Sequence, residues 1–133
     1  MVEIRNLEKT YVRKGRRIRA LKGLSVSATS GETLGIVGES GSGKSTLLRQ
    51  IACLEQADEG EIFIGGDEVT GKRTEEICQD VQMVFQDAVR SFNPRKRIQS
   101  ALDEVLKRLC NMKGPELCGE RERLIRMVGL LPE

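Results

Sequence analysis

The sequence predicts an α/β fold, and three neighbouring stretches carry that prediction. Gly38–Thr46 reads GESGSGKST, the pattern of a phosphate-binding loop. The apolar run Thr33–Val37 comes directly before it and has the length of a buried strand. Ser45–Ala52 follows with helical spacing, and Leu47, Leu48 and Ile51 are expected on one face. Strand, glycine-rich loop and helix form the setting that this motif requires, whereas a flexible Gly/Ser linker would have neither neighbour.

Each residue type in the loop has a chemical task. Glycines adopt positive φ at little cost and let phosphate oxygens approach the backbone. Successive N–H groups and the positive end of the following helix bind anions. Lys44 is expected to reach the β- and γ-phosphates, and Ser45 to offer its hydroxyl to Mg²⁺. The loop therefore predicts a P-loop nucleotide-binding fold, with these candidate binding residues: Gly38, Glu39, Ser40, Gly41, Ser42, Gly43, Lys44, Ser45 and Thr46.

Composition limits the classes to which the chain can belong. Its 133 residues suffice for one domain with a modest core, and hydrophobic residues make up 38% of them. The net charge of +2 gives no reason to expect a nucleic-acid partner. We find no apolar run of membrane-spanning length and no signal peptide, so we expect a cytoplasmic protein. The four cysteines form no Cys-x-x-Cys pair and the chain has no histidine, which favours reduced thiols over a zinc site.

Two strands are predicted before the loop. Val2–Leu7 alternates apolar and polar residues and is expected to be an edge strand, with Tyr11 close to its end. Ile18–Ala28 is expected to pair back with it across the basic turn Arg13–Arg17. Such a turn is usually a solvated loop. Alternatively, it adds positive potential near the phosphates.

Further elements are predicted after the loop and its helix. Glu61–Ile64 is expected to be a strand that enters a tight hairpin turn at Gly65-Gly66. Glu75–Gln79 has the pattern of a short helix, and Val81–Phe85 is apolar enough for a central strand. Ser91–Arg95 should form a turn, because the residue before Pro94 is pushed out of the helical region.

The C-terminal part of the chain is predicted to be helical. Ile98–Leu109 carries apolar residues at helical spacing, which indicates an amphipathic helix. Pro115 is expected to open a second helix. We therefore expect residues 1–95 to form the core around the phosphate loop and residues 96–133 to begin a helical subdomain.

Taken in order, these features resemble the N-terminal half of the nucleotide-binding domain of an ATP-binding cassette (ABC) transporter. The resemblance implies a partial ABC ATPase domain that binds ATP and Mg²⁺. By the same resemblance, Tyr11 corresponds to the aromatic residue that stacks on adenine, using its ring and not its hydroxyl. Gln86 corresponds to the glutamine that senses Mg²⁺ and the γ-phosphate, which makes it a second metal ligand beside Ser45.

The segment Val84–Arg95, VFQDAVRSFNPR, narrows the resemblance. It looks like the version found in importers of dipeptides, oligopeptides and nickel, which usually carry proline where this chain has Ala88 and leucine where it has Phe92. The resemblance implies ATP-driven uptake of peptides or a related small solute. The implied partners are membrane-spanning permease subunits and a second nucleotide-binding domain, at the inner face of the cell membrane.

The family's catalytic parts are not found in these 133 residues. In Met83–Asp87, Gln86 stands where the fourth apolar residue before the magnesium-binding acid should be, and neither an LSGGQ-like signature nor a switch histidine occurs. We therefore assign no catalytic residue and expect half a domain that binds ATP without hydrolysing it. The alternatives are a non-catalytic remnant or interaction fragment and, less favoured, a small P-loop kinase. A GTPase would need an Asn-Lys-x-Asp motif, which is absent.

Overall fold

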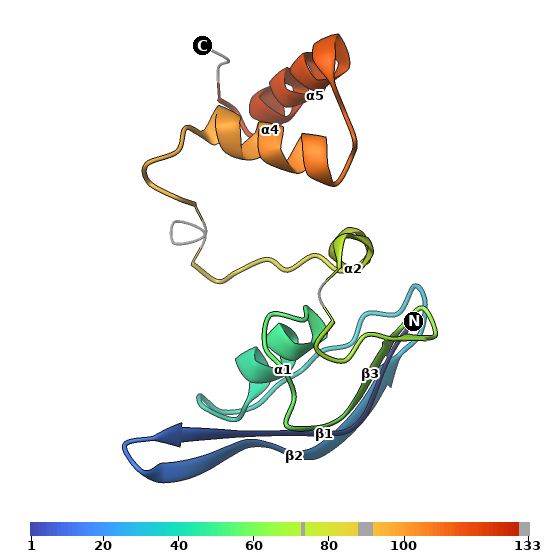
Figure 1. Ribbon diagram of the computed structural model, residues 1–133, viewed down its shortest axis with the longest axis vertical. Helices are drawn as coiled ribbons and strands as arrows, with labels where there is room; N and C mark the ends of the chain where they lie inside the picture. The colour runs from blue at the N-terminus through green and yellow to red at the C-terminus, as the bar shows by residue number, and fades with distance from the viewer. Residues whose placement is uncertain (73, 88–91, 131–133) are drawn as a thin grey trace. The chain divides into compact units, whose positions relative to one another are not determined.

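A computed structural model describes residues 1–72, 74–87 and 92–130 of the chain (Figure 1). The chain divides into two compact units, Met1–Met83 and Val84–Glu133. The predicted boundary between residues 95 and 96 stays a prediction. Among the described residues, no helix combines the length and the apolar character that crossing a membrane requires.

The first unit is built on a four-stranded antiparallel sheet in the order β2-β1-β3-β4. The strands are β1 Val2–Arg13, β2 Arg16–Ala28, β3 Glu59–Ile64 and β4 Asp67–Glu68. The predicted pairing of the first two strands is confirmed, and so is the hairpin turn at Gly65-Gly66, which joins Ile64 to Asp67. The prediction that the first strand lies at an edge is wrong. In β1, Ile4 pairs with Val26 on one side and with Ile62 on the other.

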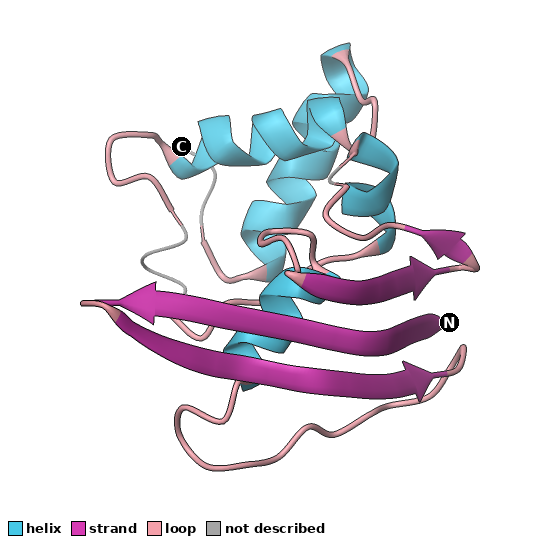
Figure 2. Cartoon of the chain, turned by 60° about the horizontal axis from the view of Figure 1, so that its bottom comes forward, coloured by secondary structure: helices cyan, strands magenta, loops and turns pink. Residues whose placement is uncertain are grey.

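Helix α1, Lys44–Ile51, packs against one face of this sheet and closes the core (Figure 2). The buried cluster consists of Ile4, Leu7, Leu21, Leu47, Cys53, Ile62 and Val69. The predicted helix is confirmed, but one residue of its predicted apolar face is wrong. Leu48 is 45% exposed, whereas Gln50 is completely buried. The helical period explains this, because positions 47, 50 and 51 share one face and position 48 lies about 100° away from 47.

Two predicted strands are wrong. Thr33–Val37 and Val81–Phe85 do not form strands, and Val37 and Val84 expose 94% and 96% of their surface. A strand exists only where its N–H and C=O groups pair with a neighbour. The described strands form one antiparallel sheet that includes neither run. Both runs are apolar, but apolar character alone is not sufficient to form a strand.

The helices predicted elsewhere are confirmed. In the first unit, α2 spans Glu75–Asp80 and is capped by Thr74, whose Oγ1 accepts a hydrogen bond from the Ile77 N–H. In the second unit, α4 spans Ile98–Arg108 and α5 spans Gly114–Met127. These two helices are joined by an ion pair of 2.9 Å between Arg121 Nη1 and Asp103 Oδ1.

The predicted turn before α4 and the importer-like segment are only partly described. Pro94 and Arg95 lie in a turn, as predicted. Ser91 of that turn and Ala88 of the importer-like segment lie outside the described residues. Phe92 is described, and its side chain is 53% exposed.

Candidate nucleotide-binding site

The stretch Gly38–Thr46 leads into α1 and lies against strand β2. At Gly43 the backbone has φ 97°, and a Cβ placed there would be 2.4 Å from the carbonyl oxygen of Ala20. Real atoms do not approach so closely, so this position requires both the positive φ and the missing side chain of glycine. Gly41 also has a positive φ, of 81°. Gly41 and Gly43 thus let the chain turn tightly and enter the helix beside the sheet, whereas Gly38 does not adopt the positive φ expected of the loop glycines.

The start of α1 is built to receive an anion. The first N–H groups of any α-helix lack a partner within the helix, and they mark its positive end. Here the residue before the helix is Gly43, which has no side chain to cap those groups, and the first turn contains no acidic residue. The first backbone bond of the helix runs from the Leu47 N–H to the Gly43 carbonyl, at 2.9 Å. These features fit a bound phosphate.

Lys44 places its charge within the same loop. Its Nζ donates to the carbonyl oxygens of Gly38 and Glu39, both at 2.7 Å, and lies 3.4 Å from Ser42 Oγ. The loop is also closed by a backbone bond of 3.3 Å from the Ser42 N–H to the Glu39 carbonyl. The ammonium group and the start of α1 are therefore held together on a single short loop, where both can act on one polyphosphate.

The predicted magnesium ligands lie in different units. Ser45 is exposed in the first turn of α1, while Gln86 is exposed in the second unit. The described residues contain no cluster of three or more His, Cys, Asp or Glu side chains suited to a metal. Mg²⁺ commonly uses one or two protein oxygens together with substrate phosphates, so the Ser45 hydroxyl fits such a site. The role of Gln86 stays a prediction.

Tyr11 lies beside the last residue of the loop. Its Oη donates to Glu55 Oε2 at 2.5 Å and lies 3.3 Å from Thr46 Oγ1. Burial raises the pKa of the Tyr11 phenol, and the hydrogen bond to Glu55 raises it further. The hydroxyl therefore has partners within the protein, which the expectation that only the ring is used did not include. Whether the ring stacks on adenine stays a prediction.

Glu55 was not found by sequence reasoning, and neither was its neighbour Arg49. Arg49 Nη1 lies 3.6 Å from Glu55 Oε1. Glu55 is 44 residues from Tyr11 along the chain. A carboxylate after a helix has no periodicity or motif that distinguishes it from other exposed acids. Only the folded structure brings it to the phenol.

The segment after α1 is tied to β1 at a second point. Lys9 Nζ donates to Asp58 Oδ1 at 2.8 Å and to the Gln56 carbonyl at 2.6 Å. The Thr10 N–H donates to Asp58 Oδ2 at 2.7 Å. The hydrogen bond from Lys9 is the main reason that the pKa of Asp58 is lowered. Two adjacent residues of β1, Lys9 and Thr10, are thus joined to the segment that follows α1.

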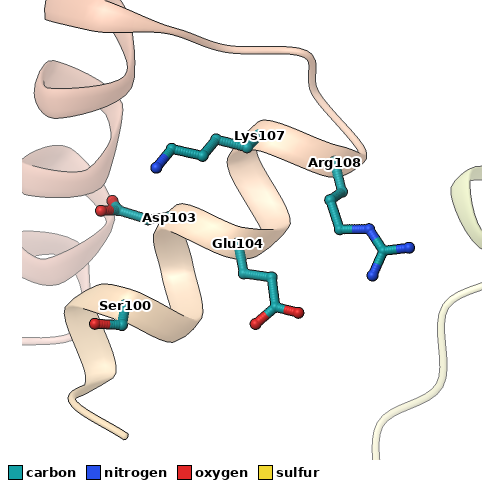
Figure 3. Close-up of a pocket in the computed structure, with 5 residues that line it drawn as sticks. All are labelled: Ser100, Asp103, Glu104, Lys107 and Arg108. Atoms are coloured by element: carbon teal, nitrogen blue, oxygen red, sulfur yellow. The ribbon is translucent and has the colours of Figure 1, made fainter.

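A separate hollow lies on α4 in the second unit (Figure 3). It is lined by Ser100, Asp103, Glu104, Lys107 and Arg108. Figure 3 shows Asp103 and Lys107 pointing to one side of the helix and Glu104 and Arg108 to the other. Asp103 is already paired with Arg121 of α5. With mixed charges and an acid that joins two helices, this hollow is no candidate for the nucleotide.

The chain is similar to a known protein family, to known relatives and to solved structures. The family model described as ABC transporter matches residues 21–130. The chain is 40% identical over 120 residues to the di/tripeptide transport ATP-binding protein DppF of Pseudomonas aeruginosa, covering 88% of this chain and 37% of the relative. It is 39% identical over 134 residues to the oligopeptide transport ATP-binding protein OppF of Haemophilus influenzae, covering 98% and 40%. The chain thus spans about two fifths of the length of these relatives.

A solved structure is similar over nearly all of the chain. It is the dimeric, post-hydrolysis state of the ATP-binding cassette MJ0796 bound to ADP and Pi. The TM-score is 0.80 at 30% sequence identity, and the match covers 98% of this chain and 58% of the other. That protein holds a nucleotide in the state described.

Proposed function

Because this chain belongs to the ABC transporter family, we propose that it binds Mg-ATP through Gly38–Thr46 as part of an importer's ATP-binding subunit. One observation carries the proposal. Gly43, Lys44 and the uncapped start of α1 lie together, so that backbone N–H groups and an ammonium group can meet one polyphosphate. The transport part of this assignment is supported by two relatives, which are named di/tripeptide and oligopeptide transport ATP-binding proteins.

Each residue of the site has a defined task in this proposal. The loop amides bind phosphate oxygens, and Lys44 exchanges its contacts with the Gly38 and Glu39 carbonyls for the β- and γ-phosphates. Ser45 provides a hydroxyl ligand to Mg²⁺, and Gln86 is proposed as a second ligand. The bound ion neutralises charge on the phosphates. The Tyr11 ring stacks on adenine beside Thr46.

The whole protein is proposed to drive uptake of peptides or a related small solute such as nickel. Its proposed partners are permease subunits and a second nucleotide-binding domain, and the dimeric cassette MJ0796 supports the latter. In this assembly the protein would be cytoplasmic and peripheral at the inner face of the membrane. Residues 1–95 would contribute the core around the loop, and residues 96–133 would begin the helical subdomain.

We further propose that these 133 residues, tested by themselves, bind ATP without hydrolysing it. Phosphoryl transfer depends on groups that orient the attacking water and stabilise the charge of the transition state. The loop provides groups for phosphates, but its one carboxylate, that of Glu39, is exposed to solvent, and the chain contains no histidine. Tight binding of the phosphates cannot replace those groups.

The binding proposal is tested by titrating the purified chain with Mg-ATP by calorimetry. Lys44→Ala should remove most of the affinity, because charge-assisted contacts to phosphate are among the stronger hydrogen bonds. Lys72→Ala, which removes an exposed lysine from the same unit, is the matched control and should bind like the parent. Equal affinity of the parent and Lys44→Ala would refute the assignment of the site.

A further inference from the structure

The hydroxyl group of Tyr11 contacts residues at and beside the phosphate loop. Its Oη donates to Glu55 Oε2 at 2.5 Å and lies 3.3 Å from Thr46 Oγ1. Arg49 Nη1 lies 3.6 Å from the other oxygen of the Glu55 carboxylate. Thr46 belongs to the first turn of α1 and Arg49 to its last turn. The phenol is therefore tied to both ends of the helix that follows the loop.

We propose that Glu55 is a positioning residue for the nucleotide base, because its carboxylate holds the Tyr11 ring in the orientation that stacks on adenine. This inference rests on the proposed function, since it needs a nucleotide whose phosphates lie at Gly38–Thr46. Glu55 itself touches no nucleotide. It acts only through the ring, so its contribution depends on the Tyr11 hydroxyl.

The physical reason is pre-organisation. A tyrosine fixed only at its backbone can rotate about two side-chain torsions, and stacking must first stop that rotation. A hydrogen bond from Oη to a carboxylate is charge-assisted, and it fixes the ring at its far end as well. Tyr11 is half-buried, so part of the ring stays accessible while its orientation is set.

The carboxylate is itself held in place. Glu55 is paired with Arg49, and the residues that follow it are bound to β1 through Lys9 and Asp58. Lys9 lies two residues before Tyr11, and its Nζ lies 5.9 Å from the centre of the Tyr11 ring. The contacts of Lys9 with Asp58 and of Tyr11 with Glu55 together hold the segment that contains Glu55 against β1. Glu55 can therefore act as a fixed anchor for the ring.

A purely structural role for Glu55 makes a different prediction. If its hydrogen bond only stabilised the fold, losing it would weaken every ligand of the loop to the same degree. A positioning role affects only ligands that carry a base. Mg-ATP and Mg-tripolyphosphate share three linked phosphates and differ in the nucleoside, so a comparison of their affinities separates the two roles.

The experiment is a double-mutant cycle on the full chain, with both ligands titrated by calorimetry. The variants are Glu55→Ala, Tyr11→Phe and the double variant, with Glu55→Gln as the conservative replacement and Glu61→Ala as the matched control. Glu55→Ala should weaken Mg-ATP binding about two- to tenfold, the usual effect of freeing one side chain, and leave tripolyphosphate unchanged. In the Tyr11→Phe background the same change should have no further effect. Glu55→Gln should retain most of the affinity, because its amide oxygen still accepts from the phenol.

A spectroscopic measurement on the same variants observes the hydrogen bond directly. The chain has one tyrosine and no tryptophan, so the near-ultraviolet absorbance of the ionised phenol reports Tyr11 alone. The carboxylate contributes to the raised pKa of Tyr11, so Glu55→Ala should lower that pKa. Glu61→Ala should leave the phenol titration unchanged.

Several results would overturn the inference. It fails if Glu55→Ala weakens both ligands equally, if its effect persists in Tyr11→Phe, or if the phenol titration does not change. If the parent binds both ligands and Glu55→Ala binds ATP as tightly as the parent, the inference fails while the proposed function stands. A parent chain that binds neither ligand would refute the proposed function and this inference with it.

Discussion

At the scale of single residues, the site depends on positions where the backbone geometry restricts which residue type can be present. Gly43 faces the Ala20 carbonyl at a distance that excludes a side chain. Lys44 next to it contacts the carbonyls of Gly38 and Glu39. A change at Gly43 therefore affects the loop, the start of α1 and the strand behind it together.

Gly43→Ala should destabilise the chain more than the same change at a glycine with open space. Gly31 is the matched control, because its φ is 80° and an added Cβ would meet nothing within 4 Å. A positive φ alone costs an alanine about 1–2 kcal/mol, and the contact with Ala20 adds to this only at Gly43. We expect urea unfolding to show a loss of about 1 kcal/mol for Gly31→Ala and of at least about 2 kcal/mol for Gly43→Ala. Equal losses would show that the close approach to Ala20 is not needed.

At the scale of elements, β1 is the centre of the first unit. It pairs with β2 and β3, carries Ile4 and Leu7 into the core, and holds the segment after α1 through Lys9 and Thr10. The Asp58 carboxylate accepts hydrogen bonds from both Lys9 Nζ and the Thr10 N–H. The position of Tyr11 beside the loop thus follows from how the strand and the chain leaving α1 are joined.

The contact between Asp58 and Lys9 should make the free energy of unfolding depend on pH. This contact lowers the pKa of Asp58 in the folded chain below the unfolded value of about 3.9. The resulting stabilisation is complete above the unfolded pKa and is lost as the pH falls through the folded pKa. The side chain is 42% exposed, so we expect a small effect. The difference in unfolding free energy between parent and Asp58→Asn should therefore be larger at pH 6 than near pH 2. A difference that does not change with pH would contradict this role.

The elements also show what could be predicted and what could not. The loop and its helix were predictable because their pattern is local, within Gly38–Ile51. That Thr33–Val37 does not form a strand could not be predicted, because strand formation depends on a neighbouring strand that a window of sequence does not contain. The contact between Tyr11 and Glu55 joins positions 44 residues apart, and no periodicity marks it. Which face of α1 is buried depends on where the sheet lies. For this reason Gln50 is buried and Leu48 is exposed.

At the scale of the whole molecule, the predicted fold class is confirmed by the likeness to the cassette MJ0796. The match to ABC transporter proteins covers most of the chain. Nucleotide binding and turnover make different demands on the chain. Binding needs the loop, which is present and shaped, whereas turnover also needs groups that orient water and stabilise the transition state.

We expect no steady ATP hydrolysis by these 133 residues above the rate in buffer. General-base positioning alone contributes about 10²–10⁴-fold, before any further transition-state contacts are considered. The assay is phosphate release from purified chain with Mg-ATP, and Lys44→Ala serves as the control for contaminating ATPases. Steady release that disappears in Lys44→Ala would show that a carboxylate such as Glu39 acts as the base.

Binding of the phosphates of ATP by Gly38–Thr46 can be observed residue by residue through amide hydrogen exchange with and without Mg-ATP. Amides that bind phosphate oxygens exchange more slowly, so protection should concentrate in the loop and the first turn of α1. The same segment of Lys44→Ala should show little protection at the same ATP concentration. Protection confined to other segments, such as α4 and α5, with none in Gly38–Thr46 at saturating Mg-ATP, would contradict the account.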